Sequence, residues 1–296
     1  MYLTITGKLG SGKSTVCKYL AEKYGFEIYS TGTVQRKIAR EMGISTLDLN
    51  ELMRKNSKYD DLIDNETVRI AKENRDKNLI FDSRMAFHFV DDSYDIFTTI
   101  DPVEAARRVS LMPRGVEEQF ATQEEAEHEL LERARIENIR FKEIYHVDNQ
   151  DYNNYSLIID TSWASPSELG DIIYKTAIDP KNAGQHLVLI SPRSLYPTKP
   201  FGGLDIEKVG RLRQPGAADD TAEMIEIKCY KNYHYVVKGH HRLAAALLDG
   251  KKFVKAVLAP AEAQEIQTGA LGIEMLHEYE KEGDFQYISY PDTYRK

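Results

Sequence analysis

The sequence is poor in cysteine and in long apolar runs. It has two cysteines, Cys17 and Cys229, in 296 residues, and their wide separation matches no spacing of a metal or redox site. This excludes a disulfide framework and favours a reducing, cytoplasmic setting. No apolar run approaches the ~18 residues of a membrane-spanning helix, so no membrane partner is expected. Because the chain opens on a strand pattern followed directly by a loop motif, we also expect no signal peptide.

The sequence also lacks an excess of basic over acidic residues. The chain has 39 Lys and Arg residues against 47 Asp and Glu residues, a formal net charge of −8, and the acidic excess lies in residues 1–180. Tight nucleic-acid binding requires clustered cations that neutralise many phosphates, so strong DNA binding is not expected. The length suits two domains of about 100–200 residues each. Neither the length nor the charge predicts an oligomeric state.

One specific motif is present near the start of the chain. Residues 7–14 read Gly-Lys-Leu-Gly-Ser-Gly-Lys-Ser, which matches GxxxxGK followed by Ser or Thr, the phosphate-binding loop (P-loop) of nucleotide-binding proteins. A strand pattern precedes it, and an amphipathic helix that ends near Gly25 follows. A glycine-rich turn with a chance lysine is the alternative, but the motif and its strand–loop–helix context agree. The predicted nucleotide-binding residues are Gly7, Gly10, Ser11, Gly12, Lys13, Ser14 and Thr15.

The chemistry of this loop requires these residue types. Backbone N–H groups and the helix N-terminus can surround phosphate oxygens, and Lys13 can reach the β- and γ-phosphates. The Ser14 hydroxyl can bind Mg²⁺. The loop therefore predicts a bound nucleoside triphosphate with Mg²⁺, and it leaves the phosphate acceptor open.

Strand and helix patterns alternate from the N-terminus to about Ala177. Short apolar strands centred on residues 3, 27, 80, 97 and 158 are separated by helix patterns, which predicts an α/β fold with a parallel sheet flanked by helices on both faces. A linker containing Pro180 and Gly184 then separates a P-loop domain over residues 1–180 from a smaller α+β domain over residues 185–296. The second domain is expected to hold a hairpin around residues 225–237 and a helical tail over residues 261–279.

Polar residues gather where the strands of the first domain end. In parallel sheets, ligands bind at the carboxyl ends of the strands, where Asp82, Arg84 and the turn Ser30-Thr31-Gly32 are expected. Asp82 is a candidate for the Mg²⁺ hydration shell, and its alternatives are a helix cap or an anchor for an arginine. Arginine suits phosphate because its planar fork matches phosphate oxygens. The candidate phosphate-binding arginines are Arg36, Arg84, Arg107, Arg108, Arg133, Arg135 and Arg140, and for Arg107, Arg108 and Arg135 a solvated helix face is an equal alternative.

Residues 1–178 resemble the small cytidylate kinases, in particular the archaeal-type cytidylate kinase-like group. The matching stretches are residues 5–16, residues 29–32 with Arg36, residues 133–145 and residues 155–162. The resemblance implies that Lys13 and the P-loop bind ATP, and that Arg133 and Arg140 close over the phosphates from a lid helix. It further implies that Mg²⁺ assists the transfer, and that Ser30 and Arg36 hold the acceptor, a nucleoside monophosphate such as CMP or dCMP. The other predicted acceptor-binding residues, Thr31, Gly32 and Arg84, are expected from their place at the strand ends.

Two positions depart from this family pattern. Ser83 stands where the family usually has glycine, and Ala134 stands where the lid usually has an acidic residue. These departures leave ATP binding intact and leave the acceptor open.

A second motif lies in the C-terminal domain. Gly239-His240-His241-Arg242 at a predicted helix start offers N–H groups, imidazoles and a guanidinium to an anion. A glycine turn that begins a structural helix is the alternative. Residues 187–258 resemble the ParB-like nucleotide-binding domain of partition proteins, sulfiredoxins and free-serine kinases. Because His240 replaces the sulfiredoxin cysteine and Lys199 replaces the serine-kinase glutamate, the resemblance implies phosphate or nucleotide sensing at residues 239–242 rather than catalysis.

The sequence therefore predicts an ATP- and Mg²⁺-dependent kinase of a small acceptor, most simply a nucleoside monophosphate, joined to a ligand-binding or regulatory domain. Two alternatives stay open. The first is a nucleotide-controlled regulator with slow NTP hydrolysis, and the second is a kinase of a non-nucleotide metabolite such as an amino acid.

Overall fold

The computed structural model describes residues 1–44, 48–49, 52–53, 58–111, 120–199, 204–214, 224–230 and 232–259, without the side chains of residues 36, 37, 58 and 59. The helix predicted to begin at Ser45 lies partly outside the described residues, and the predicted helical tail lies wholly outside them. The chain divides into two compact units, Met1–His186 and Leu187–Lys296.

The first unit is built on a parallel sheet with the strand order β2-β3-β1-β4-β5. At its centre, Thr4 of β1 lies between Phe81 of β3 and Asp95 of β4. Because the central strands are covered on both faces, consecutive residues are buried in them, and every residue of β3 and β5 is buried. The strands are β1 (Tyr2–Gly7), β2 (Glu27–Ser30), β3 (Leu79–Asp82), β4 (Ser93–Thr99) and β5 (Leu157–Asp160).

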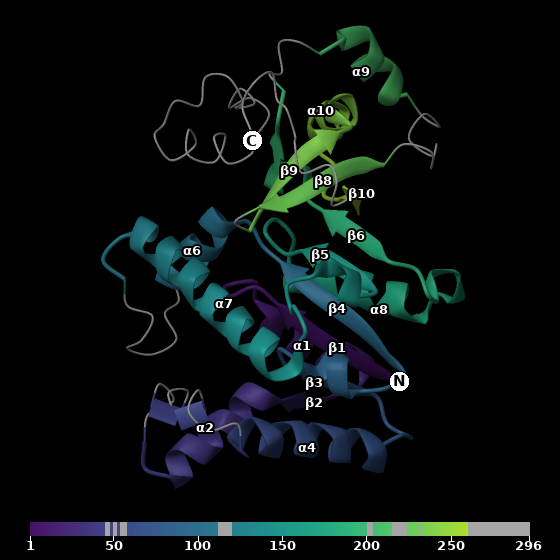
Figure 1. The fold of residues 1–296 in the computed structure, drawn as a ribbon. Coiled ribbons are helices and arrows are strands. Elements are labelled where there is room, and N and C mark those ends of the chain that lie inside the picture. The colour runs from purple at the N-terminus through teal and green to yellow at the C-terminus, as the bar shows by residue number, and fades with distance from the viewer. Residues whose placement is uncertain are drawn as a thin grey trace. The chain divides into compact units, whose positions relative to one another are not determined.

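Helices lie on both faces of this sheet (Figure 1), which confirms the predicted α/β class. Helix α1 packs against α8, α6 against α7, and α4 against α5. None of the described helices is long and apolar enough to cross a bilayer. The helices are α1 (Lys13–Tyr24), α2 (Thr31–Glu41), α4 (Lys58–Glu73), α5 (Ala86–Phe89), α6 (Pro102–Leu111), α7 (Gln123–Tyr145) and α8 (Pro166–Ile178).

Local sequence signals explain most helix ends. Thr122 caps α7 by accepting a hydrogen bond from the Glu125 N–H, and Ser165 forms a capping box with Glu168 at α8. Gly25 ends α1 in a left-handed conformation with a φ of 72°. The exception is α2, which begins at Thr31, so the predicted turn at residues 30–32 is instead the first turn of a helix.

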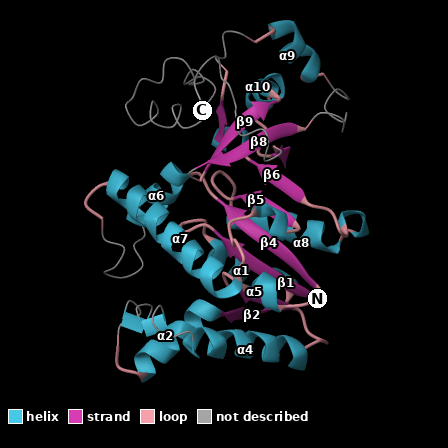
Figure 2. Cartoon of the chain, in the orientation of Figure 1, coloured by secondary structure: helices cyan, strands magenta, loops and turns pink. Residues whose placement is uncertain are grey.

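The second unit has strands in the order β6-β10-β8-β9-β7, with parallel and antiparallel neighbours. Figure 2 shows β6, β8 and β9 among its strands. The predicted hairpin is present as β8 and β9. Residues 195–197, for which the sequence analysis gave no strand, form the short strand β7 beside β9. Proline is tolerated there because Pro197 ends a strand at the last position in the order. The elements are β6 (Leu187–Ile190), β7 (Leu195–Pro197), α9 (Ile206–Leu212), β8 (Ile225–Tyr230), β9 (Tyr233–Lys238), α10 (His240–Leu248) and β10 (Val254–Leu258).

Candidate active site

The loop between β1 and α1 has the backbone of a phosphate-binding loop. Gly10 and Gly12 have φ angles of 78° and 74°, a left-handed conformation that glycine adopts without steric cost. Ser11 Oγ lies 2.9 Å from Thr98 Oγ1, which fastens the loop to β4. No side chain caps α1 at Gly12, so the first N–H groups of the helix point into the loop, as an anion-binding helix start requires.

Gly7 is required for a different reason, the close approach of β4. A Cβ atom at Gly7 would overlap Thr98 Oγ1 and the Thr98 carbonyl oxygen, and would lie 2.9 Å from Thr98 Cβ. The next residue is held by the same neighbour, because the Lys8 N–H donates to the Thr98 carbonyl at 2.9 Å. Only a residue without a side chain lets β1 pass into the loop here.

Lys13, Ser14 and Asp82 converge at the carboxyl ends of β1 and β3. Lys13 Nζ lies 2.6 Å from Asp82 Oδ1, and the Ser14 hydroxyl donates to Asp82 Oδ2 at 3.2 Å. Burial by itself would raise the pKa of the Asp82 carboxyl. The charge of Lys13, hydrogen bonds from Lys13 and Ser14, and the charge of Arg84 outweigh it and hold that pKa below its ordinary value. Asp82 is therefore an ionised carboxylate at neutral pH.

These residues fit ATP and Mg²⁺. The Ser14 hydroxyl and the Asp82 carboxylate present neighbouring oxygen ligands, which Mg²⁺ prefers. Among the described residues, no group of three or more His, Cys, Asp or Glu side chains could hold a metal ion. Mg²⁺ usually keeps several waters and binds through one or two carboxylates and the substrate phosphates, so Ser14 and Asp82 could hold it together with ATP.

Arg84 joins this group from the end of β3. Its Nη1 donates to the Gly7 carbonyl oxygen, and its Nε lies 3.3 Å from Glu137 Oε2 on α7. The other oxygen of Glu137, Oε1, lies 3.3 Å from Nε of Arg133. One carboxylate therefore connects an arginine of the sheet edge with an arginine of the predicted lid helix.

Arg140, the second predicted lid arginine, lies against α4. Its Nη2 pairs with Asp60 Oδ1 at 2.9 Å, with side-chain exposures of 17% and 5%. One turn further, the Tyr145 hydroxyl donates to Asp64 Oδ2 at 2.6 Å. The structure thus brings Arg133 close to Arg84 but pairs Arg140 with a buried carboxylate, so its phosphate-binding role stays a prediction.

The acceptor residues predicted at the end of β2 lie at the start of α2. Ser30 occupies the N-cap position, and Thr31 and Gly32 form the first helical turn. All three are partly exposed, as a binding surface requires. Arg36 belongs to α2, but its side chain lies outside the described part of the structure.

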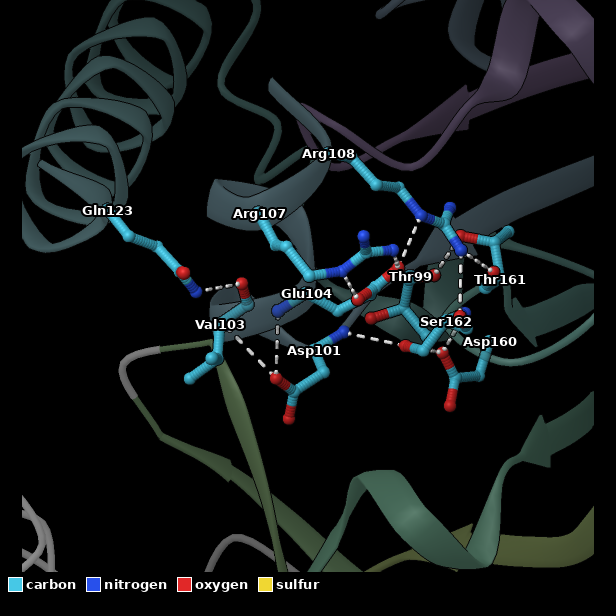
Figure 3. A network of polar contacts seen from close by, with 10 residues as sticks. All are labelled: Thr99, Asp101, Val103, Glu104, Arg107, Arg108, Gln123, Asp160, Thr161 and Ser162. Atoms are coloured by element: carbon cyan, nitrogen blue, oxygen red, sulfur yellow. Dashed lines mark hydrogen bonds and ion pairs between the residues drawn. The ribbon is translucent and has the colours of Figure 1, made fainter. Parts of the chain in front are cut away.

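Arg108 makes a contact that the sequence analysis did not predict. Its Nε bonds Glu104 Oε1 at 2.8 Å, and its Nη2 donates to the carbonyl oxygens of Thr161 and Ser162, each at 2.7 Å (Figure 3). A Cβ atom on Gly12 would lie 3.8 Å from Arg108 Nη1, so this guanidinium borders the P-loop. It therefore does not belong to a solvated helix face.

Arg107 and Arg135, for which a solvated helix face was also an equal alternative, are more exposed than Arg108. Arg107 pairs with the same buried Glu104 at 2.6 Å and is half exposed. Arg135 pairs with Glu132 at 2.6 Å on an exposed part of α7, which favours the solvated-face alternative for that residue.

The sequence reasoning also missed Glu104, Glu137 and Asp60 as partners of the arginines. Glu104 precedes Arg108 by four residues and Glu137 follows Arg133 by four, a spacing that places each pair on one helix face. That signal was available. The Asp60–Arg140 pair joins residues 80 positions apart, and no sequence spacing indicates it.

In the second unit, both predicted histidines hold structural contacts. His240 Nε2 accepts from the Thr198 N–H at 3.1 Å, and His241 Nε2 accepts from the Asp205 N–H at 3.1 Å. Burial, with the charges of Lys199 and His241, lowers the pKa of His240 to about 4, so its imidazole is neutral at pH 7. Gly239 has a φ of 97°, and no side chain caps the start of α10. Anion binding at residues 239–242, which include Arg242, stays a prediction.

Known proteins resemble the first unit. Residues 2–163 match the model of the cytidylate kinase-like family. A cytidylate kinase of Natronomonas pharaonis is 31% identical over 173 residues, which cover 58% of this chain and 87% of that protein. A cytidylate kinase of Methanosarcina mazei is 31% identical over 179 residues, which cover 60% of this chain and 97% of that protein.

A relative with a different name shares the same region. The S-adenosylmethionine-dependent nucleotide dehydratase of Lacinutrix mariniflava is 31% identical over 172 residues, which cover 58% of this chain but only 34% of that protein. A segment similar to the first unit therefore also occurs inside a longer protein.

Solved structures resemble the chain only weakly. The shikimate kinase of Bacteroides thetaiotaomicron superposes with a TM-score of 0.40 at 14% identity, covering 59% of this chain and 98% of that one. This similarity carries no information on function. The family match extends over more than half of the chain and includes the P-loop, Asp82, Arg84 and the arginines of α7. The chain therefore belongs to the cytidylate kinase-like family.

Proposed function

We propose that this chain transfers the terminal phosphoryl group of ATP to a nucleoside monophosphate, with CMP or dCMP as the acceptor. The observation that carries the proposal is the convergence of Lys13, Ser14, Asp82 and Arg84 at the carboxyl ends of β1 and β3. Family membership supports a phosphotransferase, and the names of the cytidylate kinase relatives suggest the acceptor.

Each of these residues has a distinct part in the proposed reaction. The P-loop N–H groups and Lys13 hold the β- and γ-phosphates, because Lys13 can exchange its contact with Asp82 for a phosphate oxygen. Mg²⁺, bound near Ser14 and Asp82 with ATP, would neutralise phosphate charge. Arg84 and Arg133 orient the acceptor phosphate and stabilise charge on the transferred group. The middle of helix α7, which carries Arg133, would cover the site and exclude water.

For the second unit we propose binding of a phosphate or nucleotide at the start of α10. The helix N-terminus lacks a side-chain cap. Burial, with the charges of Lys208 and Lys199, lowers the pKa of His241, and the charge of Asp205 opposes this shift. This cationic helix start suits an anion. Calorimetry with ATP, CMP and inorganic phosphate on wild type and Arg242→Ala tests this proposal. If the two proteins give the same binding heats with each of the three ligands, the proposal is contradicted.

The proposed kinase activity is tested by ADP release from Mg·ATP with CMP, dCMP, UMP, AMP, GMP, free serine or no acceptor. A strong response to CMP or dCMP is expected. Release that does not depend on the acceptor would contradict the assignment and favour a nucleotide-controlled regulator. A response to serine alone would favour a metabolite kinase.

A matched pair of variants tests the site. Lys13→Ala should lower kcat by about 10²- to 10³-fold, because the transferred charge loses a preorganised cation. Lys18→Ala removes an exposed lysine from the same helix and should leave turnover unchanged. Wild-type turnover in a well-folded Lys13→Ala protein would refute the site assignment.

A further inference from the structure

Glu137 carries an inference that rests on the proposed function and goes beyond it. We infer that Glu137 is a positioning residue, whose carboxylate holds Arg84 and Arg133 in the orientation in which they stabilise the transferred phosphoryl group. It acts through these two arginines and not on the reacting atoms. Glu137 lies in the family-matching stretch 133–145, but neither the resemblance nor the residue spacing assigned it a role.

The geometry of the two ion pairs supports this role. Glu137 approaches each arginine at Nε, and both N–O distances are 3.3 Å. A guanidinium held at Nε keeps its two Nη groups for other acceptors, and these form the fork that matches phosphate oxygens. Arg84 uses Nη1 to bond the Gly7 carbonyl of the P-loop. Among the described residues, Arg133 has no polar partner other than Glu137.

A neighbouring pair on the same helix shows the contrast. Glu132 binds Arg135 through both Nε and Nη2, at 2.8 and 2.6 Å, and both side chains are more than a third exposed. This pair uses most of the Arg135 fork and contacts no residue of the site. The Glu137 side chain is less exposed, at 29%, and its carboxylate is shared between two elements.

The charges define what the arrangement does. Two guanidinium groups and one carboxylate leave a net charge of +1 beside the P-loop, which attracts a phosphate. Glu137 also competes with that phosphate for the same arginines. Removal of its charge should therefore strengthen phosphate binding and, because the arginines lose their orientation, weaken catalysis.

Glu137→Gln separates this role from a structural one. We expect kcat with the best acceptor to fall by about 10- to 100-fold, because misoriented cations stabilise the transition state poorly. The KM for that acceptor should fall by about two- to fivefold, since an exposed ion pair competes with it only modestly. The KM for ATP and the Tm should stay at their wild-type values. A merely structural residue would raise KM and lower Tm together.

Three measurements accompany this variant. Glu132→Gln, the matched control, should behave as wild type. Arg133→Lys keeps the charge but removes the Nε contact. The fold-loss of kcat in the double variant with Glu137→Gln should therefore be smaller than the product of the fold-losses in the two single variants. Calorimetry with CMP alone and with inorganic phosphate alone should show tighter binding to Glu137→Gln than to wild type.

The calorimetry separates this inference from the proposed function, because it needs no turnover. If wild type phosphorylates no acceptor, the proposed function fails, and tighter phosphate binding by Glu137→Gln still supports the counter-ion role. If wild type is an active kinase, then unchanged kcat in Glu137→Gln, fully multiplicative losses with Arg133→Lys, or an equal loss in Glu132→Gln overturns the inference.

Discussion

Asp82 is buried, yet both of its carboxylate oxygens have a partner in the site. Lys13 contacts one oxygen and Ser14 donates to the other, so the ionised form is favoured despite burial. The same three side chains are those that would receive ATP and Mg²⁺. The ion pair with Asp82 holds the Lys13 ammonium group at the loop. In the proposed reaction, a phosphate oxygen of ATP would replace Asp82 as the partner of Lys13.

Asp64 is a half-buried carboxylate in a different electrostatic setting. Burial raises the pKa of Asp64 to about 6, and the charges of Asp60 and Asp61 add to this, whereas the Tyr145 hydrogen bond and the Arg140 charge oppose it. Because the folded-state pKa lies above the unfolded value near 4, the folded protein binds more protons between these pH values. The contribution of Asp64 therefore becomes unfavourable as pH rises from about 4 through 6.

Asp64→Asn should remove this dependence. The amide retains an acceptor for the Tyr145 hydroxyl and carries no charge. The stability that the variant gains over wild type, measured as the difference between their free energies of unfolding, should be larger at pH 7 than at pH 4.5 by roughly 1–3 kcal/mol. Urea unfolding of both proteins at both pH values measures it. Asp76→Asn, at an exposed carboxylate, is the control, and an equal pH effect there would contradict the assignment to Asp64.

At the scale of elements, the middle and the C-terminal end of helix α7 are held in different ways. Near its middle, Glu137 and Arg133 meet Arg84 at the edge of the sheet. One turn later, Arg140 and Tyr145 bind Asp60 and Asp64 of α4. The helix therefore connects the P-loop region with the helix that follows the predicted acceptor residues. Movement of α7 would change both contacts together.

Arg140→Gln tests the anchoring of α7 to α4. Removal of one partner leaves the Asp60 carboxylate buried without its cation, which should cost about 3–5 kcal/mol in unfolding free energy. The double variant Asp60→Asn with Arg140→Gln should recover part of that loss. Urea unfolding and amide exchange in α7 measure both effects, and Arg135→Gln at the exposed pair should cost less than about 1 kcal/mol.

Activity of the same variants decides between two roles of Arg140. If Arg140→Gln keeps wild-type stability and loses turnover, Arg140 is the phosphate-binding cation of the lid, as the family resemblance implies. If stability falls and the double variant restores turnover with it, the residue anchors the helix.

At the scale of the whole molecule, every residue of the candidate site lies in Met1–His186. The family match, residues 2–163, lies there as well. Residue 186 is a natural end for a fragment, since His186 Nδ1 lies 2.6 Å from the Tyr155 carbonyl oxygen at the start of β5. A compact unit with its own core can in principle fold alone.

The fragment 1–186 should fold and phosphorylate the acceptor with kcat/KM within about threefold of the full chain, because its core and site are complete. Circular dichroism and the ADP-release assay measure this. Arg242→Ala in the full chain is the companion variant and should leave turnover unchanged. An insoluble or inactive fragment, or lost turnover in Arg242→Ala, would show that catalysis depends on the second unit.

Much of the fold could be predicted because its signals are local. The P-loop, the apolar strands around residues 80 and 158, and the caps at Thr122 and Ser165 each depend on a few adjacent residues. The turn predicted at residues 30–32 was wrong, and the short strand β7 was not predicted. In both places, backbone hydrogen bonding to other residues overrode the local sequence signals. The helix α5 has four residues and no periodicity to detect.

The sequence by itself determined the nucleotide-binding chemistry, since Gly7, Lys13, Ser14 and their spacing specify a phosphate loop wherever a strand and a helix flank them. Only the tertiary structure decided which distant partner holds Arg84 and Arg140. The sequence shows these residues as arginines, but it does not show which carboxylate pairs with each. The Arg84–Glu137 and Arg140–Asp60 contacts depend on how β3, α4 and α7 pack, and the second joins residues 80 positions apart.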